Sequence, residues 1–218
     1  MNDEKKVSAA VIQRLPRYYR YLGDLLDNDI TRISSKELSA RMGITASQIR
    51  QDLNNFGSFG QQGYGYNVAT LYGEIGRILG LDRSYKLILI GAGNFGQALV
   101  NYPYFARRGY NFVALLDSDA GIIGKTVGGA VVMDVAHLPQ YLKEHHVDIA
   151  VLTLPGHAAK QIEGILINSD IKGIWNFSDS DINAPDGITV ENVRLTDSLM
   201  TLSYEINKDD ILRRMRVD

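Results

Sequence analysis

Gly91, Gly93 and Gly96 have the spacing G-x-G-x-x-G, directly after the apolar run 86–90 and before a stretch with helical character. In this context the first glycine permits a tight turn, and the second lets backbone N–H groups approach a pyrophosphate. The third glycine lets the helix pack closely on the strand, while the helix N-terminus supplies partial positive charge. The pattern therefore predicts a loop that binds the pyrophosphate of a dinucleotide.

Asp117 narrows the choice of dinucleotide. It follows Gly96 by 21 positions and ends the apolar run 112–117, where an acidic side chain accepts hydrogen bonds from the adenosine ribose. A carboxylate there would repel a 2′-phosphate, and residues 118–120 contain no arginine to receive one, so NADH and NAD+ are favoured over their phosphorylated forms. The alternatives are a glycine turn that binds nothing and a site for another nucleotide or coenzyme A. The predicted cofactor-binding residues are Gly91, Ala92, Gly93, Asn94, Phe95, Gly96, Tyr102, Asp117, Thr153, Leu154 and Pro155.

The sequence offers no clear catalytic group beside this loop. A dehydrogenase needs a proton donor or acceptor near the nicotinamide, commonly His or a Tyr/Lys pair, and usually a further domain to shape a substrate pocket. His157 follows the run 148–154 and could lie near a nicotinamide, but a residue in the first turn of a helix is the favoured interpretation. Tyr102 could line the site, although aromatic side chains beside Pro103 are as often core packing. We expect no catalytic residue and no enzyme activity.

Residues 34–53 have the pattern of a helix-turn-helix. Two capping boxes, Ser34 with Glu37 and Thr45 with Gln48, can each start a helix, and Gly43 supplies the turn between them. Polar side chains of the second helix can then reach base edges and phosphates in a major groove. The segment 55–68, with alternating aromatic and glycine residues and a tip at 61–63, is typical of a β-hairpin wing.

The segment before this motif adds basic residues. Pro16 is expected near a helix start, and Arg14, Arg17 and Arg20 are spaced to contact phosphates. The alternative is a small helical module that binds another protein, since helix-turn-helix shapes also occur without DNA. The predicted DNA-binding residues are Arg14, Arg17, Thr45, Ser47, Gln48, Arg50, Gln51, Ser58, Gln61, Gln62 and Tyr64.

Composition excludes several classes of protein. The chain has 218 residues, a net charge of −2 and no cysteine, so disulfides, thiolate catalysis and cysteine metal sites are excluded. The four histidines show no convincing metal-ligand spacing. We find neither a membrane-spanning apolar run nor a signal peptide at the N-terminus, which leads us to expect a cytoplasmic protein without membrane contact.

The chain is predicted to be α/β, with an N-terminal winged helix-turn-helix domain at 1–84, a Rossmann-like parallel-sheet domain at 85–195 and a C-terminal helix at 196–218. Apolar runs without polar alternation, separated by helical stretches, indicate a parallel sheet covered on both faces. They occur at 86–90, 112–117, 148–154, 173–177 and 188–192. In the last segment Leu199, Leu202 and Ile206 recur at helical spacing and need a surface on which to bury.

The combined motifs resemble the Rex family of redox-sensing transcriptional repressors over essentially the whole chain. They read RLPRYYRYL, ITASQIRQDLNNFGSFGQQGYGYNV, LILIGAGNFGQAL, LTLP and GIWNF. The resemblance implies a homodimer that binds an A/T-rich palindromic operator in double-stranded DNA, senses NADH and NAD+, and exchanges its C-terminal helix between subunits. It places the DNA-contacting helix on Thr45 to Leu53, with Arg50 prominent, and the wing on Ser58 to Tyr66.

The sequence departs from that family at three places. Gln51 stands where relatives usually have a second basic residue, and Gln61 and Gln62 stand where they have one or two at the wing tip. The loss of such phosphate contacts should weaken DNA binding and flatten its salt dependence. Near the start of the terminal helix some relatives have an acid that could pair with the arginine at Arg14. This chain has Arg194 there, with Asp197 as the nearest acid, so the sequence does not predict such an interdomain ion pair.

The leading hypothesis is a repressor that senses the NADH/NAD+ ratio and that NADH releases from operators of genes for NADH reoxidation, fermentation and respiration. A site with apolar walls should prefer the uncharged nicotinamide of NADH. The main alternative is a small NAD-dependent oxidoreductase whose front domain is an interaction module. A second alternative is a nucleotide-gated protein that acts on another protein.

Overall fold

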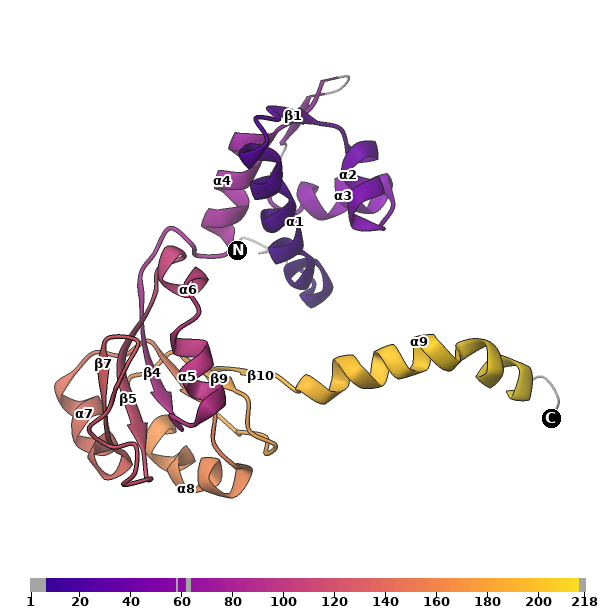
Figure 1. The fold of residues 1–218 in the computed structure, drawn as a ribbon. Coiled ribbons are helices and arrows are strands. Elements are labelled where there is room, and N and C mark those ends of the chain that lie inside the picture. Colours follow the sequence, from indigo (N-terminus) through magenta and orange to yellow (C-terminus); the bar gives the residue numbers. More distant parts are fainter. Residues whose placement is uncertain (1–6, 58, 62–63, 216–218) are drawn as a thin grey trace. The chain divides into compact units, whose positions relative to one another are not determined.

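The computed structural model describes residues 7–57, 59–61 and 64–215, and the chain divides into two compact units, Met1–Arg83 and Ser84–Asp218 (Figure 1). The division falls one residue before the predicted domain boundary. No helix among these described residues has the length and apolar character needed to cross a membrane.

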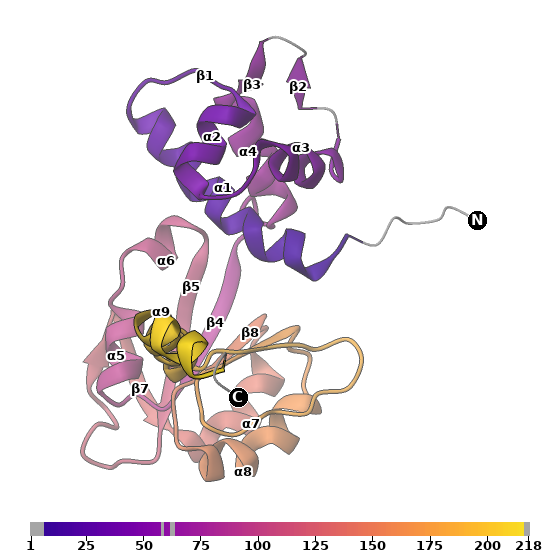
Figure 2. The same ribbon diagram turned by 90° about the vertical axis from the view of Figure 1, so that its right-hand side faces the viewer.

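The first unit contains α1 (Ala9–Asp27), β1 (Arg32–Ile33), α2 (Ser35–Met42), α3 (Ala46–Asn54), β2 (Gly60–Gln61), β3 (Gly65–Asn67) and α4 (Val68–Ile78). The strands form an antiparallel sheet in the order β1-β3-β2. Figure 2 shows the hairpin of β2 and β3 projecting beyond the helices. The predicted winged helix-turn-helix is therefore confirmed, and the sequence analysis missed only the short strand β1.

Local signals explain where α2 and α3 begin and end. The Ser34 hydroxyl accepts the Glu37 N–H while the Glu37 carboxylate accepts the Ser34 N–H, which completes the first capping box. Gly43 then ends α2 with φ of 67°, a left-handed conformation that glycine adopts without strain. Thr45 caps α3 by accepting the Gln48 N–H at 3.1 Å. The predicted second capping box is wrong in one respect. The Gln48 side chain does not bond back to the Thr45 N–H but donates to the buried carboxylate of Asp52.

Pro16 lies inside α1 and not near its start, so that prediction is wrong. The helix begins seven residues earlier, at Ala9. Pro16 is on the exposed side of the helix, so the carbonyl of Ile12 that it leaves without an N–H donor can meet water. Leu15, Tyr18 and Leu22 continue the buried stripe on the other side.

The second unit is a Rossmann-like sheet of seven strands in the order β10-β9-β8-β4-β5-β7-β6. Its strands are β4 (Tyr85–Ile90), β5 (Tyr110–Asp117), β6 (Thr126–Val127), β7 (Ala130–Asp134), β8 (Ile149–Leu152), β9 (Gly173–Asn176) and β10 (Thr189–Asn192). Its helices are α5 (Asn94–Val100), α6 (Tyr104–Arg107), the 3-10 turn Val135–His137, α7 (Leu138–Glu144), α8 (Gly156–Ile167) and α9 (Leu195–Met215). All five predicted strands are present and pair in parallel, and β6 and β7 were missed.

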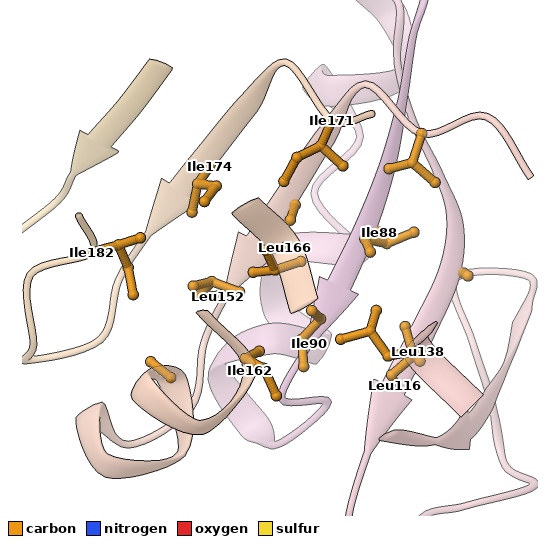
Figure 3. Close-up of a cluster of buried hydrophobic side chains, with 14 residues drawn as sticks. Ile88, Ile90, Leu116, Leu138, Leu152, Ile162, Leu166, Ile171, Ile174 and Ile182 are labelled. Carbon is orange, nitrogen blue, oxygen red and sulfur yellow. The ribbon is translucent and has the colours of Figure 1, made fainter. Parts of the chain in front are cut away.

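The continuous apolar runs arise because both faces of the sheet are covered. In β4, Ile88 and Ile90 face one core while Leu87 and Leu89 face the other, as the two-residue period of a strand requires. Figure 3 shows Ile162 and Leu166 of α8 lying over the first of these cores. The second core contains Leu99 and Val100 and a set of aromatic side chains.

The terminal helix α9 keeps its predicted apolar stripe exposed. Leu199, Leu202 and Ile206 are 62%, 54% and 72% exposed. Tyr204 is also exposed and lies two residues from both Leu202 and Ile206, which places it on nearly the opposite side of the helix. This second apolar side was not predicted. Exchange of α9 between two subunits stays a prediction.

Candidate nucleotide site and DNA-binding surface

Gly91 makes the turn that leaves β4. Its φ is +100°, and a Cβ there would approach the carbonyl oxygen of Thr153 to 2.7 Å, so only glycine fits. The Thr153 hydroxyl donates to the Gly91 carbonyl at 2.6 Å, and the Thr153 N–H donates to Ile90 at 2.9 Å. The ends of β4 and β8 are thereby fastened together at the point where the strand order reverses, which is where doubly wound sheets bind their ligands.

The other two glycines of the motif have different surroundings. A Cβ on Gly96 would lie 2.3 Å from the Gly91 carbonyl oxygen and 2.9 Å from Leu89 Cδ2, so glycine is needed for α5 to sit against β4. Gly93 precedes α5 in an extended conformation, and a Cβ there would meet nothing within 4 Å. The loop therefore packs tightly on its inner side and is open at Gly93. This is the geometry that a pyrophosphate on backbone N–H groups requires.

Asp117 lies half-buried at the end of β5, next to the loop in the sheet order. Its Oδ1 accepts the N–H of Asp119 at 2.9 Å, which fixes the carboxylate at the start of the following turn. A carboxylate has about four acceptor positions, so this bond leaves others for ribose hydroxyls. Asp134 stands directly beside it, at the end of β7.

A second helix starts at this edge of the sheet, just after Thr153, Leu154 and Pro155. The first N–H of α8, on Gly156, donates to the carboxylate of Asp179 at 2.7 Å. A Cβ on Gly156 would collide with Asp179 and Ser180, so the close approach depends on glycine. The Asp179 carboxylate therefore occupies the first N–H of α8 and opposes the partial positive charge at this helix end. Sequence reasoning missed Asp179, and its only signal was the run of Ser and Asp at 178–181.

Aromatic side chains line the sheet beside the loop. The Phe95 ring lies 5.1 Å from Phe177, which lies 4.6 Å from Trp175, and the row continues to Phe105 at 5.6 Å. Tyr102 belongs to the far end of this row, since it lies two residues after the last residue of α5, and its ring lies 5.4 Å from that of Phe105. The seven-residue helix, about 10 Å long, separates it from the glycine loop. That Tyr102 lines the nucleotide site stays a prediction. His157 lies in the first turn of α8, as the favoured interpretation had it.

The outward side of α3 carries the predicted DNA contacts. Ser47, Arg50 and Gln51 are exposed, while Ile49 and Leu53 are buried in the core of the first unit. The Arg50 guanidinium donates to the Ser35 hydroxyl at 3.1 Å, so it lies across the start of α2. Arg17 donates to the last carbonyl of α2, on Met42, at 2.8 Å. Arg50 and Arg17 stay predictions as DNA contacts.

Arg14 and Gln48 have a different environment from the one expected. Arg14 donates two hydrogen bonds to Asp52, from Nε at 2.7 Å and Nη2 at 2.8 Å, and the Gln48 amide donates to the same carboxylate at 2.8 Å. Tyr18 adds a fourth bond at 2.9 Å. The donors that were expected to face DNA therefore face a fully buried acid. Sequence reasoning missed Asp52, because its partners on α1 are 34 and 38 positions away.

This cluster shifts the pKa values of its members. Burial raises the pKa of Asp52, but the hydrogen bonds from Arg14, Gln48 and Tyr18 outweigh it, so the pKa is lowered overall. Burial raises the pKa of Tyr18, and its hydrogen bond to the Asp52 carboxylate raises it further. Asp52 is thus held ionised and Tyr18 neutral.

The wing is held by a glycine and a basic residue that was not predicted. A Cβ on Gly65, where φ is +69°, would lie 2.6 Å from the Ile33 carbonyl oxygen, so β1 and β3 can approach closely only with glycine. Arg32 donates to the Tyr64 carbonyl at 3.3 Å, and its guanidinium lies 5.8 Å from the centre of the Tyr64 ring. Tyr64 is 70% exposed. Ser58 and Gln62 lie outside the described residues, as does the side chain of Gln61.

Arg194, which stands at the start of the terminal segment, is bonded within its own unit. It donates to the Ser178 carbonyl and lies 2.5 Å from an Asp181 carboxylate oxygen. Arg14 is likewise paired with Asp52 in the first unit. Among the described residues, no group of three or more His, Asp and Glu side chains is placed to hold a metal ion.

Two family models match parts of this chain. Residues 6–54 match the family model "Putative DNA-binding protein N-terminus", and residues 82–180 match "CoA binding domain". A curated relative from Clostridioides difficile (strain 630), "Redox-sensing transcriptional repressor Rex", is 55% identical over 94% of this chain and 97% of its own.

Solved structures extend the similarity to the fold. RSP, a Rex-family repressor, in complex with beta-NAD+ and operator DNA is 48% identical, with a TM-score of 0.91 over 98% of this chain and 99% of its own. The complex of RSP with beta-NADH is 46% identical, with a TM-score of 0.88 over 96% of this chain and 98% of its own.

Proposed function

This chain belongs to the Rex family of redox-sensing transcriptional repressors, and we propose that it binds operator DNA as a repressor and senses NADH and NAD+. The family predicted from the motifs is confirmed. The curated relative matches over nearly its whole length, so both units take part in the comparison.

The observation that carries the proposal is the glycine loop and its surroundings. Gly91 and Gly96 are each pressed against backbone atoms, whereas Gly93 is open, so backbone N–H groups can approach a pyrophosphate. Asp117 would hold the adenosine ribose, and Thr153 fixes the turn. The bound ligand supplies a nicotinamide that is positive in NAD+ and neutral in NADH. The apolar and aromatic residues near the loop, Phe95 and Phe177, favour the neutral form.

We propose a homodimer that presents two α3 helices to the half-sites of an A/T-rich palindrome. Exposed apolar side chains on two sides of α9 support an assembly in which a second copy covers them. The dimer would have two arrangements, one of which matches the operator and one of which binds NADH more tightly. A rise in NADH then shifts the population toward release, by as much as the difference in affinity between the two arrangements allows.

The proposal assigns no catalytic role to any residue. The relative from Clostridioides difficile is named a redox-sensing transcriptional repressor, and RSP is solved with beta-NAD+ and operator DNA, so we propose that the dinucleotide loop of this chain serves as a sensor. NADH and operator DNA would meet in the cytoplasm, where we place the protein. Steady oxidation of NADH by the purified chain with any small substrate would contradict this assignment.

The direct test is fluorescence anisotropy of a labelled A/T-rich palindromic duplex, titrated with the protein at fixed salt and then with NADH or NAD+. We expect NADH to release the duplex at concentrations where NAD+ has little effect. Equal effects of the two nucleotides at saturation would rule out redox sensing. Tight DNA binding that neither nucleotide changes would leave the second unit with another role.

A further inference from the structure

We infer that Asp52 is a positioning residue for DNA recognition, which fixes the rotation of α3 against α1 and so aims the exposed side chains of α3. This inference rests on the proposed function, because it assigns Asp52 a part in operator binding. Asp52 itself points into the core and is fully buried, so it would touch no DNA.

The hydrogen bonds to Asp52 join α1 and α3, and each helix contributes two residues that lie one turn apart. Asp52 and Gln48 are one turn apart on α3, and Arg14 and Tyr18 are one turn apart on α1. All three partners donate to the one carboxylate, at distances from 2.7 to 2.9 Å, and both of its oxygens are used. A pair of side chains on each helix, bonded to a single centre, resists rotation of α3 about its own axis.

Small rotations matter for base reading. An atom about 6 Å from a helix axis moves about 2 Å when the helix turns by about 20°. Hydrogen bonds to base edges tolerate only a few tenths of an ångström in length. Arg50 and Gln51, on the outward side of α3, therefore depend on whatever sets the rotation of the helix.

Apolar packing alone would not set this rotation as narrowly. Ile49 and Leu53 bury the same side of α3, but dispersion contacts have little directional preference. A buried ion pair is weak evidence for stability, because well-packed apolar residues often replace one without loss. The directional bonds to Asp52 are better explained by the orientation that they impose on α3.

The pairing of Arg14 with Asp52 also limits what Arg14 can contribute to phosphate binding. Two of its donors are committed to Asp52, and the pair is neutral. Removal of Arg14 should therefore leave the salt dependence of DNA binding unchanged, whereas removal of a phosphate contact lowers the slope by about one.

The test compares Asp52→Asn with Glu74→Gln, which removes the same charge from an exposed carboxylate on α4 that pairs with Arg77. Dissociation constants are measured for the A/T-rich palindrome and for an unrelated duplex of equal length, at several salt concentrations. We expect Asp52→Asn to weaken binding to the palindrome about tenfold or more and to change binding to the unrelated duplex less than about threefold. Glu74→Gln should change the dissociation constants for the palindrome and for the unrelated duplex by the same factor. A preference for the palindrome that Asp52→Asn leaves intact would overturn the inference.

A milder variant covers the case in which Asp52→Asn does not fold. Tyr18→Phe keeps the buried ring and removes one of the four bonds to Asp52, so the preference for the palindrome should fall about two- to fivefold. Unchanged preference in a folded Tyr18→Phe protein would also overturn the inference. If the wild-type chain prefers neither duplex, the proposed function itself fails and this inference falls with it.

Discussion

The Thr153 hydroxyl and the Gly91 carbonyl oxygen lie 2.6 Å apart, so the end of β8 holds the turn that follows β4. The shape of the glycine loop is therefore set partly by a residue 62 positions further along the chain and not by the loop alone. This coupling makes the loop sensitive to changes at its packed side.

Gly96→Ala should damage the nucleotide site. The added methyl would lie 2.3 Å from the Gly91 carbonyl oxygen, which is backbone and cannot swing aside, so α5 must move. We expect a loss of about 1–3 kcal/mol in the stability of the second unit and a fall of more than about tenfold in NADH affinity, measured by fluorescence titration. Gly164→Ala is the matched control, because a Cβ there meets nothing within 4 Å and should stabilise α8 by about 1 kcal/mol.

Asp117→Ala should weaken NADH binding while leaving DNA binding by the nucleotide-free protein intact. In the proposed site the carboxylate would accept hydrogen bonds from ribose hydroxyls and repel a 2′-phosphate, so the variant should also discriminate less between NADH and NADPH. The ratio of the two dissociation constants checks this directly. Loss of both nucleotide and DNA binding would instead indicate that Asp117 is needed for folding.

Arg50→Ala should weaken operator binding by about 1–3 kcal/mol and lower its sequence specificity, with NADH affinity unchanged. Arg50 is exposed on α3 and is held beside Ser35, at the start of α2. Anisotropy with the palindrome gives the DNA affinity, and a parallel NADH titration reports on the second unit. Arg77→Ala, which removes an exposed arginine side chain from α4, serves as the control for loss of one positive charge. An operator affinity equal to that of the control would remove Arg50 from the interface.

The first unit should lose stability in acid through Asp52. Its pKa is lowered in the folded state, so its contribution is fully present above the unfolded value of about 4 and is lost as the pH falls through the folded value. The free energy of unfolding, measured with urea between pH 6 and 3, should therefore fall more steeply with decreasing pH for wild type than for Asp52→Asn. Parallel plots of the free energy of unfolding against pH for the two proteins would show that ionisation of Asp52 does not contribute to stability.

Leu202→Asp together with Ile206→Asp should shift the chain toward monomer in sedimentation analysis. Both side chains are exposed on one side of α9, and charges there oppose burial against a second copy. The control is Asn207→Asp, whose side chain is exposed on the same helix outside this stripe. A double variant with unchanged mass in solution would place the dimer interface elsewhere.

Signals that lie close together in the sequence were sufficient to predict much of this structure. The apolar run 86–90, the three glycines and the Ser34 capping box are local signals, and each produced the expected element. Features that depend on distant partners were not predictable. Asp52 reads as an ordinary polar position of a helix until Arg14 of α1 is placed against it, and Asp179 shows its role only when β9 lies beside β8.

The carboxylate of Asp179 on the Gly156 N–H makes the two helix ends at this edge of the sheet unequal. At α8 the Asp179 carboxylate already accepts the first N–H, whereas α5 begins at Asn94 after Gly93, which has no side chain to cap it. We therefore expect phosphates to bind at the start of α5 and not at the start of α8. A dinucleotide has a charged pyrophosphate in its middle and a different ring at each end. Because the two helix ends differ, such a ligand should bind in a single orientation.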